Sequence, residues 1–134
     1  MSRVLIVDDD ADLGWLLQTF MQLAGHATAF AADGAEGFRK VDEFCPEVVL
    51  LDVEMPTLDG PGLMAQMLIA DCGRENIPVI LLSGVVGLSH VAARVGTPYY
   101  LEKPVTADQL ERMVELVLAE RRPPRPRHGE DQCA

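Results

Sequence analysis

A chain of 134 residues has the size of one compact domain and can bury a core without disulfides or a structural metal. Its formal net charge of −10 at pH 7 argues against direct nucleic-acid binding, because an acidic surface repels phosphates. No apolar run approaches the roughly 20 residues of a membrane-spanning helix, so we expect no membrane insertion.

Cysteine usage points to a reducing compartment. Cys45, Cys72 and Cys133 are scattered and form no CxxC pair. This pattern favours small buried hydrophobic residues and one thiol near the end of the chain over a metal site or a disulfide framework. We therefore expect a cytoplasmic protein.

Short apolar runs alternate with longer amphipathic stretches, which predicts a repeated strand–helix unit. In chain order, the runs that predict buried parallel strands are Arg3–Val7, Ala27–Phe30, Glu47–Leu51, Ile77–Leu82 and Pro98–Leu101. The unit occurs five times. We therefore expect an α/β fold with a doubly wound, five-stranded parallel sheet and five helices.

The first helix is predicted over Ala11–Ala24, with Gly25 ending it. Several apolar side chains recur at helical spacing and should pack on the sheet: Leu13, Leu16, Leu17, Phe20 and Met21. At about 100° per residue, this packing turns Trp15, the only tryptophan, toward solvent.

The middle helices are predicted after Asp33-Gly34, after Asp59-Gly60-Pro61, and in a short form over Ser89–Val95. The last covers Thr106–Arg121 and starts with a capping box, since Gln109 follows Thr106 by three residues. We expect residues 1–121 to form one domain. Residues 122–134 are rich in proline and arginine, which predicts a disordered tail.

Polar residues follow four of the predicted strands. The first strand leads to Asp8, Asp9 and Asp10, and the third leads to Asp52; Ser83 follows the fourth strand and Lys103 the fifth. In an open α/β sheet, ligands bind beyond the carboxyl ends of the strands. We therefore expect these side chains to meet at one edge of the sheet.

The chemistry of this set suggests a phosphorylation site. Crowded carboxylates raise one another's pKa unless a cation compensates, and their hard oxygen ligands suit Mg²⁺. Beside a metal ion, Asp52 could act as a nucleophile toward a phosphoryl group. The Ser83 hydroxyl and the Lys103 ammonium would bind the phosphoryl oxygens. Each residue alone is weak evidence, since a pair of aspartates after a strand is more often a solvated turn; the joint placement is strong.

The strings VLIVDDD, VVLLDVEMPTLDG, VILLSG and YYLEKP, in this order, resemble the response-regulator receiver domain of two-component signalling. The likeness covers about residues 3–120 and implies the strand order 2-1-3-4-5 of a flavodoxin-like sheet. It implies that Asp52 is the phosphoacceptor and that Lys103 pairs with the phosphoryl group. Ser83 and Tyr100 match the two switch positions, and the bond from Lys103 to Pro104 is cis in the family.

The resemblance also implies a metal site and partners. Asp9, Asp52 and the backbone carbonyl of Glu54 would bind Mg²⁺ directly, and Asp8 would act mostly through a bound water. The phosphodonor would be a histidine kinase or phosphotransfer domain, docked on a surface that includes Trp15 and Val105. A downstream protein would bind the face formed by the fourth helix, fifth strand and fifth helix, and a phosphorylation-dependent dimer is left open. The chain would catalyse only its own phosphorylation and dephosphorylation.

Other interpretations remain open. A haloacid-dehalogenase-type phosphatase also uses an aspartate after a strand, but Glu54 replaces its second aspartate and the chain has no room for a cap. A flavodoxin-like cofactor module would place three aspartates against a phosphate, and a pseudo-receiver would not need the full residue set. The receiver is expected to stand alone; the alternative is one excised from a longer transcription factor or hybrid kinase. Trp15 could instead cover a seam of the core, and Tyr100 could be an ordinary half-buried strand residue.

Overall fold

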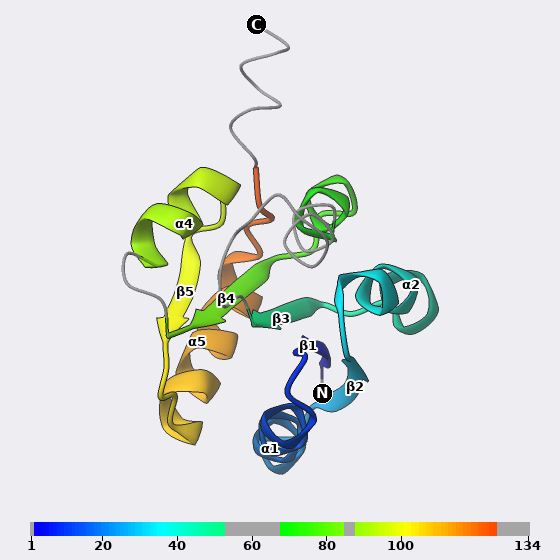
Figure 1. Cartoon of the computed structure of the whole chain (residues 1–134), viewed down its shortest axis with the longest axis vertical. Helices are drawn as coiled ribbons and strands as arrows, with labels where there is room; N and C mark the ends of the chain where they lie inside the picture. Colours follow the sequence, from blue (N-terminus) through cyan, green and yellow to red (C-terminus); the bar gives the residue numbers. More distant parts are fainter. Residues whose placement is uncertain (1, 53–67, 85–87, 126–134) are drawn as a thin grey trace, which may run out of the picture.

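The computed structural model describes residues 2–52, 68–84 and 88–125, apart from the side chains of residues 94 and 95. It forms one five-stranded parallel sheet in the order β2-β1-β3-β4-β5, which confirms the predicted fold (Figure 1). The strands are β1 (Arg3–Val7), β2 (Ala27–Ala31), β3 (Val48–Asp52), β4 (Val79–Ser83) and β5 (Tyr99–Glu102). The helices with defined bounds are α1 (Ala11–Leu23), α2 (Gly34–Phe44), α4 (Leu88–Val95) and α5 (Ala107–Glu120), and residues 68–74 are also helical.

Helices cover both faces of the sheet. In Figure 1, α1 and α5 lie on one side of the strands, and α2, the helix at residues 68–74 and α4 lie on the other. Two separate hydrophobic clusters match these layers: Leu17, Met21 and Val114 belong to one, and Val41 and Leu68 to the other. The strands between them are buried on both faces, which explains their nearly continuous apolar runs.

Several strands extend further into the polar residues than the apolar pattern predicts. β3 ends at Asp52, β4 at Ser83 and β5 at Glu102, each one residue beyond its predicted end. The reason is the parallel hydrogen-bond ladder, which pairs Asp52 with Leu82 and Ser83 with Glu102. These polar residues are therefore held by strand backbone rather than by loops.

The first helix packs differently from the prediction at one position. Leu16 was expected on the sheet side but is 39% exposed, whereas Gly14 is buried. A β-carbon on Gly14 would collide with the ring of Phe30, so the missing side chain lets this ring pack against the backbone of α1. The buried face of α1 is therefore centred on Gly14 and Leu17. As predicted, Gly25 follows the helix with a positive φ of 95°.

The last helix confirms its predicted start. The Thr106 hydroxyl accepts a hydrogen bond from the Gln109 amide at 3.1 Å, and the Gln109 side chain accepts one from the Thr106 amide at 3.0 Å. Residues 122–125, expected in a disordered tail, instead lie against the domain, with Pro124 buried. The other tail residues lie outside the described part of the chain, and the domain boundary stays a prediction.

The described cysteines divide into one buried and one exposed. Cys72 is buried, and burial raises the pKa of its thiol to about 12, so it acts as a small hydrophobic residue. Cys45 was expected to be buried but is exposed, and it forms the left-handed C-cap of α2. Within the described residues, no helix combines the length and apolar character needed to cross a membrane.

Candidate functional site

The sheet register brings the acidic residues together. Val7 pairs with Leu51 across β1 and β3, so Asp8 and Asp52, each one position further along, become neighbours. One carboxylate oxygen from each of Asp8, Asp9 and Asp52 lies within 4.8 Å of the others. The structure thus joins residues that are more than 40 positions apart in the sequence, as the strand-end argument predicted.

Asp8 is the buried member of this acidic cluster. Asp8 is only 1% exposed, and its Oδ1 accepts a hydrogen bond from the Asp10 amide at 2.8 Å. Its Oδ2 has no hydrogen-bond partner among the residues that the structure describes. Asp9 is exposed at the mouth of the cluster. A buried carboxylate beside two other carboxylates is a suitable ligand for a cation or for water bound to one.

The electrostatics of Asp8 point the same way. The pKa of Asp8 is raised from the ordinary value of 3.8 to about 7, chiefly by burial and in part by the neighbouring Asp52 carboxylate. The Asp10 amide and the Lys103 ammonium act in the opposite direction. Without a metal ion, the acidic cluster therefore retains a proton up to neutral pH, and a divalent cation would displace that proton. The donor set fits Mg²⁺, which prefers carboxylate and water oxygens.

Lys103 supplies the positive charge beside the acceptor. Its Nζ lies 2.6 Å from Oδ1 of Asp52, and the two side chains are 21% and 2% exposed. The backbone supports this placement, because the Lys103 amide donates to the Ser83 carbonyl at 2.9 Å. The bond from Lys103 to Pro104 is cis, as the resemblance implied. Ser83 is fully buried at the end of β4, the strand between β3 and β5.

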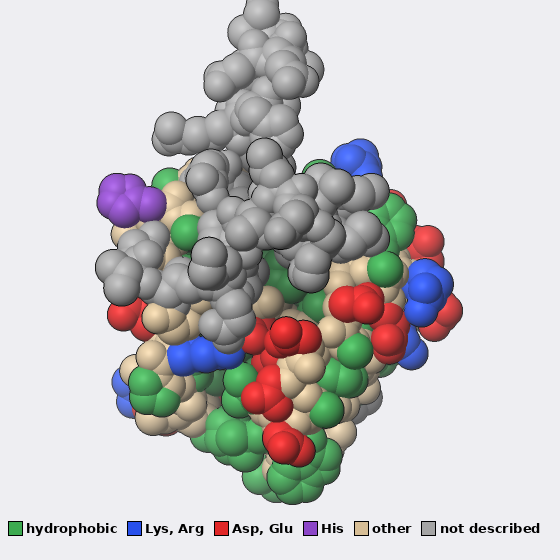
Figure 2. Space-filling view, in the orientation of Figure 1, with side chains coloured by type: hydrophobic (Ala, Val, Ile, Leu, Met, Phe, Trp, Pro, Cys, Tyr) green, Lys and Arg blue, Asp and Glu red, His purple; other side chains and the backbone are tan. Residues whose placement is uncertain are grey.

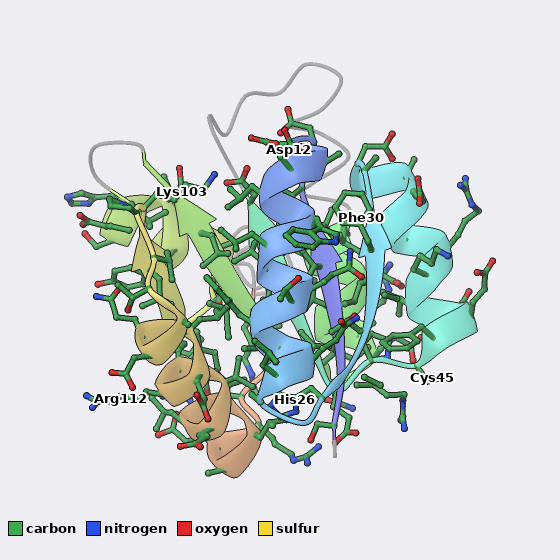
Figure 3. The ribbon with its side chains drawn as sticks, turned by 90° about the horizontal axis from the view of Figure 1, so that it is seen from below. Asp12, His26, Phe30, Cys45, Lys103 and Arg112 are labelled. Carbon is green, nitrogen blue, oxygen red and sulfur yellow. The ribbon has the colours of Figure 1, made fainter. Side chains whose placement is uncertain are left out.

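The whole set lies at one end of the molecule. In Figure 3, Asp12 and Lys103 lie at the end that carries the start of α1, whereas His26, Cys45 and Arg112 lie toward the opposite end. Figure 2 shows acidic side chains gathered at the centre of the face toward which the strands point. The acidic cluster is thus reachable from solvent through Asp9, while Asp8 is withdrawn behind it.

The remaining residues singled out from the sequence lie on α1, on β5 or shortly after it, or outside the described residues. Tyr100 is 37% exposed on β5, with its backbone opposite Leu81 of β4. Trp15 is 67% exposed on α1, which confirms the predicted orientation. Val105 is half-buried and packs against the hydrophobic cluster that contains Leu17 of α1 and Val114 of α5. Glu54, whose carbonyl was expected to bind the metal, lies outside the described residues.

Sequence reasoning missed the role of Asp10. Its carboxylate caps α1 by accepting hydrogen bonds from the amides of Asp12 and Leu13, at 3.0 and 3.2 Å. Its own amide binds Asp8. Asp10 therefore fixes the turn that presents Asp8 and Asp9. An acid immediately before the first helix is a recognisable N-cap signal, but it was hidden within a run of three aspartates.

Comparison with known proteins agrees with this geometry. A model of the response regulator receiver domain matches residues 4–115. Transcriptional regulatory protein PrrA of Mycobacterium bovis is 35% identical over 121 residues, which are 89% of this chain and 51% of that protein. A probable transcriptional regulator, ycf27 of Guillardia theta, is 35% identical over 122 residues, which are 87% of this chain and 45% of that protein. The chain thus spans about half the length of these curated relatives.

A solved structure shows the same architecture. The CheY-like response regulator receiver domain protein from Methanospirillum hungatei JF-1 superposes with a TM-score of 0.76 at 26% sequence identity. The match covers 90% of this chain and 96% of that protein's chain. This similarity spans the sheet and the helices on both of its faces.

Proposed function

This chain belongs to the response regulator receiver domain family, and from that membership we propose that Asp52 accepts a phosphoryl group and thereby switches a protein contact. The proposal rests on the groups that surround the Asp52 carboxylate. Its buried carboxylate lies within the acidic cluster and 2.6 Å from the Lys103 ammonium. A nucleophilic carboxylate, a site for a cation and a fixed positive charge are the groups that phosphoryl transfer requires.

The transfer itself needs little from the protein beyond position and charge. An Asp52 carboxylate oxygen forms the new bond to phosphorus. The phosphorus–nitrogen bond to the donor histidine breaks, and the nitrogen keeps the electron pair. Lys103 holds the acceptor carboxylate in place beforehand and offsets negative charge on the phosphoryl oxygens afterwards. Attack by water on the aspartyl phosphate would restore Asp52, so the chain acts on its own phosphoryl group only.

The residues that would hold Mg²⁺ are Asp9 and Asp52, with Asp8 acting through a bound water and the backbone carbonyl of Glu54 completing the set. Two observations support this assignment: Oδ2 of Asp8 has no hydrogen-bond partner within the described part of the chain, and the pKa of Asp8 is raised. When bound, the ion would supply positive charge for the incoming phosphoryl oxygens. The protein residues contribute the fixed arrangement of carboxylates that makes binding selective for a hard cation.

The switch that we propose runs from Asp52 through Ser83 to Tyr100. The buried Ser83 hydroxyl would donate a hydrogen bond to a phosphoryl oxygen once Asp52 is modified, and Tyr100 would turn inward from its half-exposed position. Ser83 and Tyr100 lie on adjacent strands of the sheet, β4 and β5. The phosphoryl group can favour the inward state only by the contacts that differ between the two states.

A receiver domain implies a kinase partner. We propose that the phosphodonor is a histidine kinase or phosphotransfer domain in the cytoplasm, and that Trp15 and Val105 contribute to its docking surface. The output would be a protein bound at the α4–β5–α5 face, with dimerisation left open. We propose a stand-alone regulator, although the curated relatives are longer transcription regulators and a receiver within a longer protein is the alternative.

The direct test is labelling by acetyl phosphate in the presence of Mg²⁺, followed by intact-protein mass spectrometry. The parent protein should gain one phosphoryl group, and Asp52→Asn should gain none. Asp42→Asn, which changes an exposed aspartate on α2, is the matched control and should label like the parent. Equal labelling of Asp52→Asn would refute the assignment of the acceptor.

A further inference from the structure

The chain turns back at the end of α5 and crosses the region that precedes β5. Arg121 caps α5 in the left-handed conformation, with φ of 54°, and residues 122–125 follow it along the domain. We call residues 122–125 the C-terminal strap. Its two amides are both hydrogen-bonded: Arg122 donates to the Tyr99 hydroxyl at 3.4 Å, and Arg125 donates to the Gly96 carbonyl at 3.0 Å.

Two glycines make room for the strap. A β-carbon on Gly96 would overlap the carbonyl oxygen of Arg125, and one on Gly73 would lie 2.7 Å from the carbonyl oxygen of Pro124. Gly96 also has a positive φ of 83°, a conformation that favours glycine. Pro124 is buried in this contact. The strap therefore fits a surface shaped for backbone approach.

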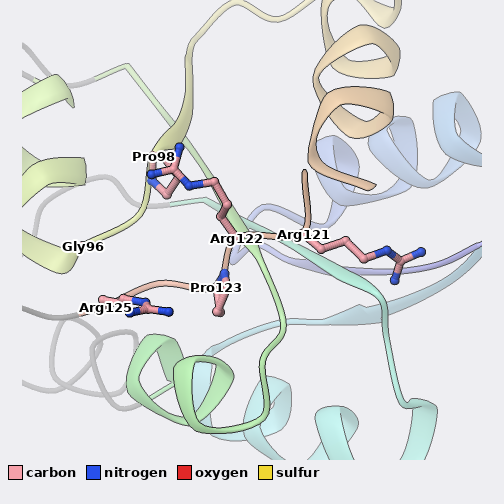
Figure 4. Close-up of a pocket in the computed structure, with 6 residues that line it drawn as sticks. All are labelled: Gly96, Pro98, Arg121, Arg122, Pro123 and Arg125. Atoms are coloured by element: carbon pink, nitrogen blue, oxygen red, sulfur yellow. The ribbon is translucent and has the colours of Figure 1, made fainter. Parts of the chain in front are cut away.

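The strap is stiff but lightly held. Pro123 and Pro124 restrict the backbone to extended conformations, so docking sacrifices little chain entropy. A cavity of about 470 Å³ lies between the strap and the segment before β5, lined by Gly96, Pro98, Arg121, Arg122, Pro123 and Arg125 (Figure 4). In Figure 4 the Arg121 side chain points away from Arg125, and it pairs with Glu47 at 3.3 Å. Open space therefore lies beside part of the strap.

Both hydrogen bonds of the strap go to residues beside α4 or within β5, two elements of the proposed α4–β5–α5 output face. Gly96 immediately follows α4, and Tyr99 begins β5, next to Tyr100. The Tyr99 hydroxyl also donates to Glu120 at 2.9 Å, which joins β5 to the end of α5. Any shift of α4 or β5 must therefore change the acceptors to which the strap is attached.

We propose that the C-terminal strap is a conformational coupling device: it is docked on Gly96 and Tyr99 in the unphosphorylated protein and is released when α4 and β5 move. This inference rests on the proposed function and extends the switch to the C-terminal strap. Because coupling is reciprocal, a docked strap also holds α4 and β5 in the unphosphorylated arrangement. Loosening the strap should then favour modification of Asp52.

Hydrogen exchange in the full chain tests this directly, since Pro123 and Pro124 have no amide. Exchange within residues 122–125 thus reports only the two strap amides, Arg122 and Arg125. In the parent protein, adding beryllium fluoride with Mg²⁺, a stable mimic of the phosphoryl group, should speed exchange of both amides at least fivefold. Gly96→Ala should make the same amides exchange rapidly before any modification.

Tyr99→Phe is the milder variant, because it removes the acceptor of Arg122 and keeps the ring. It should raise the affinity for beryllium fluoride about fivefold, as linkage requires. Glu120→Ala removes the other partner of the Tyr99 hydroxyl and should not alter Arg122 exchange. Unchanged strap exchange in protein whose Asp52 is occupied would overturn the coupling alone. Failure of Asp52 to accept either acetyl phosphate or beryllium fluoride would overturn the proposed function and the coupling together.

Discussion

Nζ of Lys103 lies 2.6 Å from Oδ1 of Asp52, although β4 separates the two strands that present these residues. The lysine side chain reaches past the end of β4, where Ser83 accepts a hydrogen bond from the Lys103 amide. The pair neutralises a carboxylate that is 2% exposed and would otherwise face Asp8 without compensation. It also holds the proposed acceptor in one orientation before any phosphodonor arrives.

Magnesium should stabilise the folded protein. A cation that binds only the folded state raises the free energy of unfolding by about 2.7 kcal/mol at a hundredfold excess over its Kd. Urea unfolding with MgCl₂ and with EDTA measures this difference. Asp9→Asn should abolish most of it, whereas Asp42→Asn, on exposed α2 surface, should keep it. Identical unfolding curves for the parent protein in both buffers would contradict the metal site.

The stability of the metal-free protein should depend on Asp8. Burial raises the pKa of this carboxyl from 3.8 to about 7, so the folded state holds a proton that the unfolded state releases between these values. The contribution of this proton to the free energy of unfolding is fully present below about pH 4, declines as the pH rises, and is lost above about pH 7.

Urea unfolding in EDTA at pH 5 and pH 8 measures this contribution. Asp8→Asn cannot titrate at this position, so its loss of stability from pH 5 to pH 8 should be smaller than that of the parent. The same loss in parent and variant would show that Asp8 does not hold a proton in the folded state. Saturating Mg²⁺ should reduce the difference between them, because a cation favours the ionised carboxylate.

Ser83→Ala should separate phosphorylation from switching. The variant keeps Asp52 and Lys103, so acetyl phosphate should still label it, with the rate reduced by about tenfold or less for one lost hydrogen bond. The response at Tyr100 should be largely lost, as followed by NMR of the tyrosine ring with and without beryllium fluoride. A full Tyr100 response in Ser83→Ala, or none in the parent, would contradict the relay.

Trp15→Ala should weaken phosphotransfer from the cognate kinase while labelling by acetyl phosphate stays intact. Trp15 is 67% exposed, so truncation removes contact surface without opening a core cavity. We expect at least a tenfold loss, about 1.4 kcal/mol, in the second-order rate of transfer. Leu23→Ala, 82% exposed at the far end of the same helix, is the control. Loss of both activities, with a lower melting temperature, would indicate a packing role instead.

The sequence was sufficient for the architecture and for most of the site. Alternating apolar runs and amphipathic stretches predict five strand–helix units, because buried parallel strands and surface helices have different hydrophobic periods. The positions of Asp8, Asp52, Ser83 and Lys103 at strand ends predict their convergence. Capping signals at Thr106 and Gly25 are equally local, and the structure confirms both.

Features that depend on contacts between distant segments were not predictable in this way. Leu16 is exposed and Gly14 is buried because Phe30, on β2, packs against the backbone of α1. Burial raises the pKa of Asp8 only once the sheet and Asp52 surround it. The strap was expected to be disordered from its composition, yet Gly73 and Gly96 offer it a surface that composition does not reveal.

Local chemistry by itself therefore determined which residues could act, since hydrophobic period, turn residues and strand ends are properties of short segments. Only the tertiary structure decided how these residues act on one another. The 2.6 Å pair of Asp52 and Lys103, the raised pKa of Asp8 and the docking of Arg125 on Gly96 each depend on segments far apart in the chain. Their strength depends on the distance, burial and shape that folding creates.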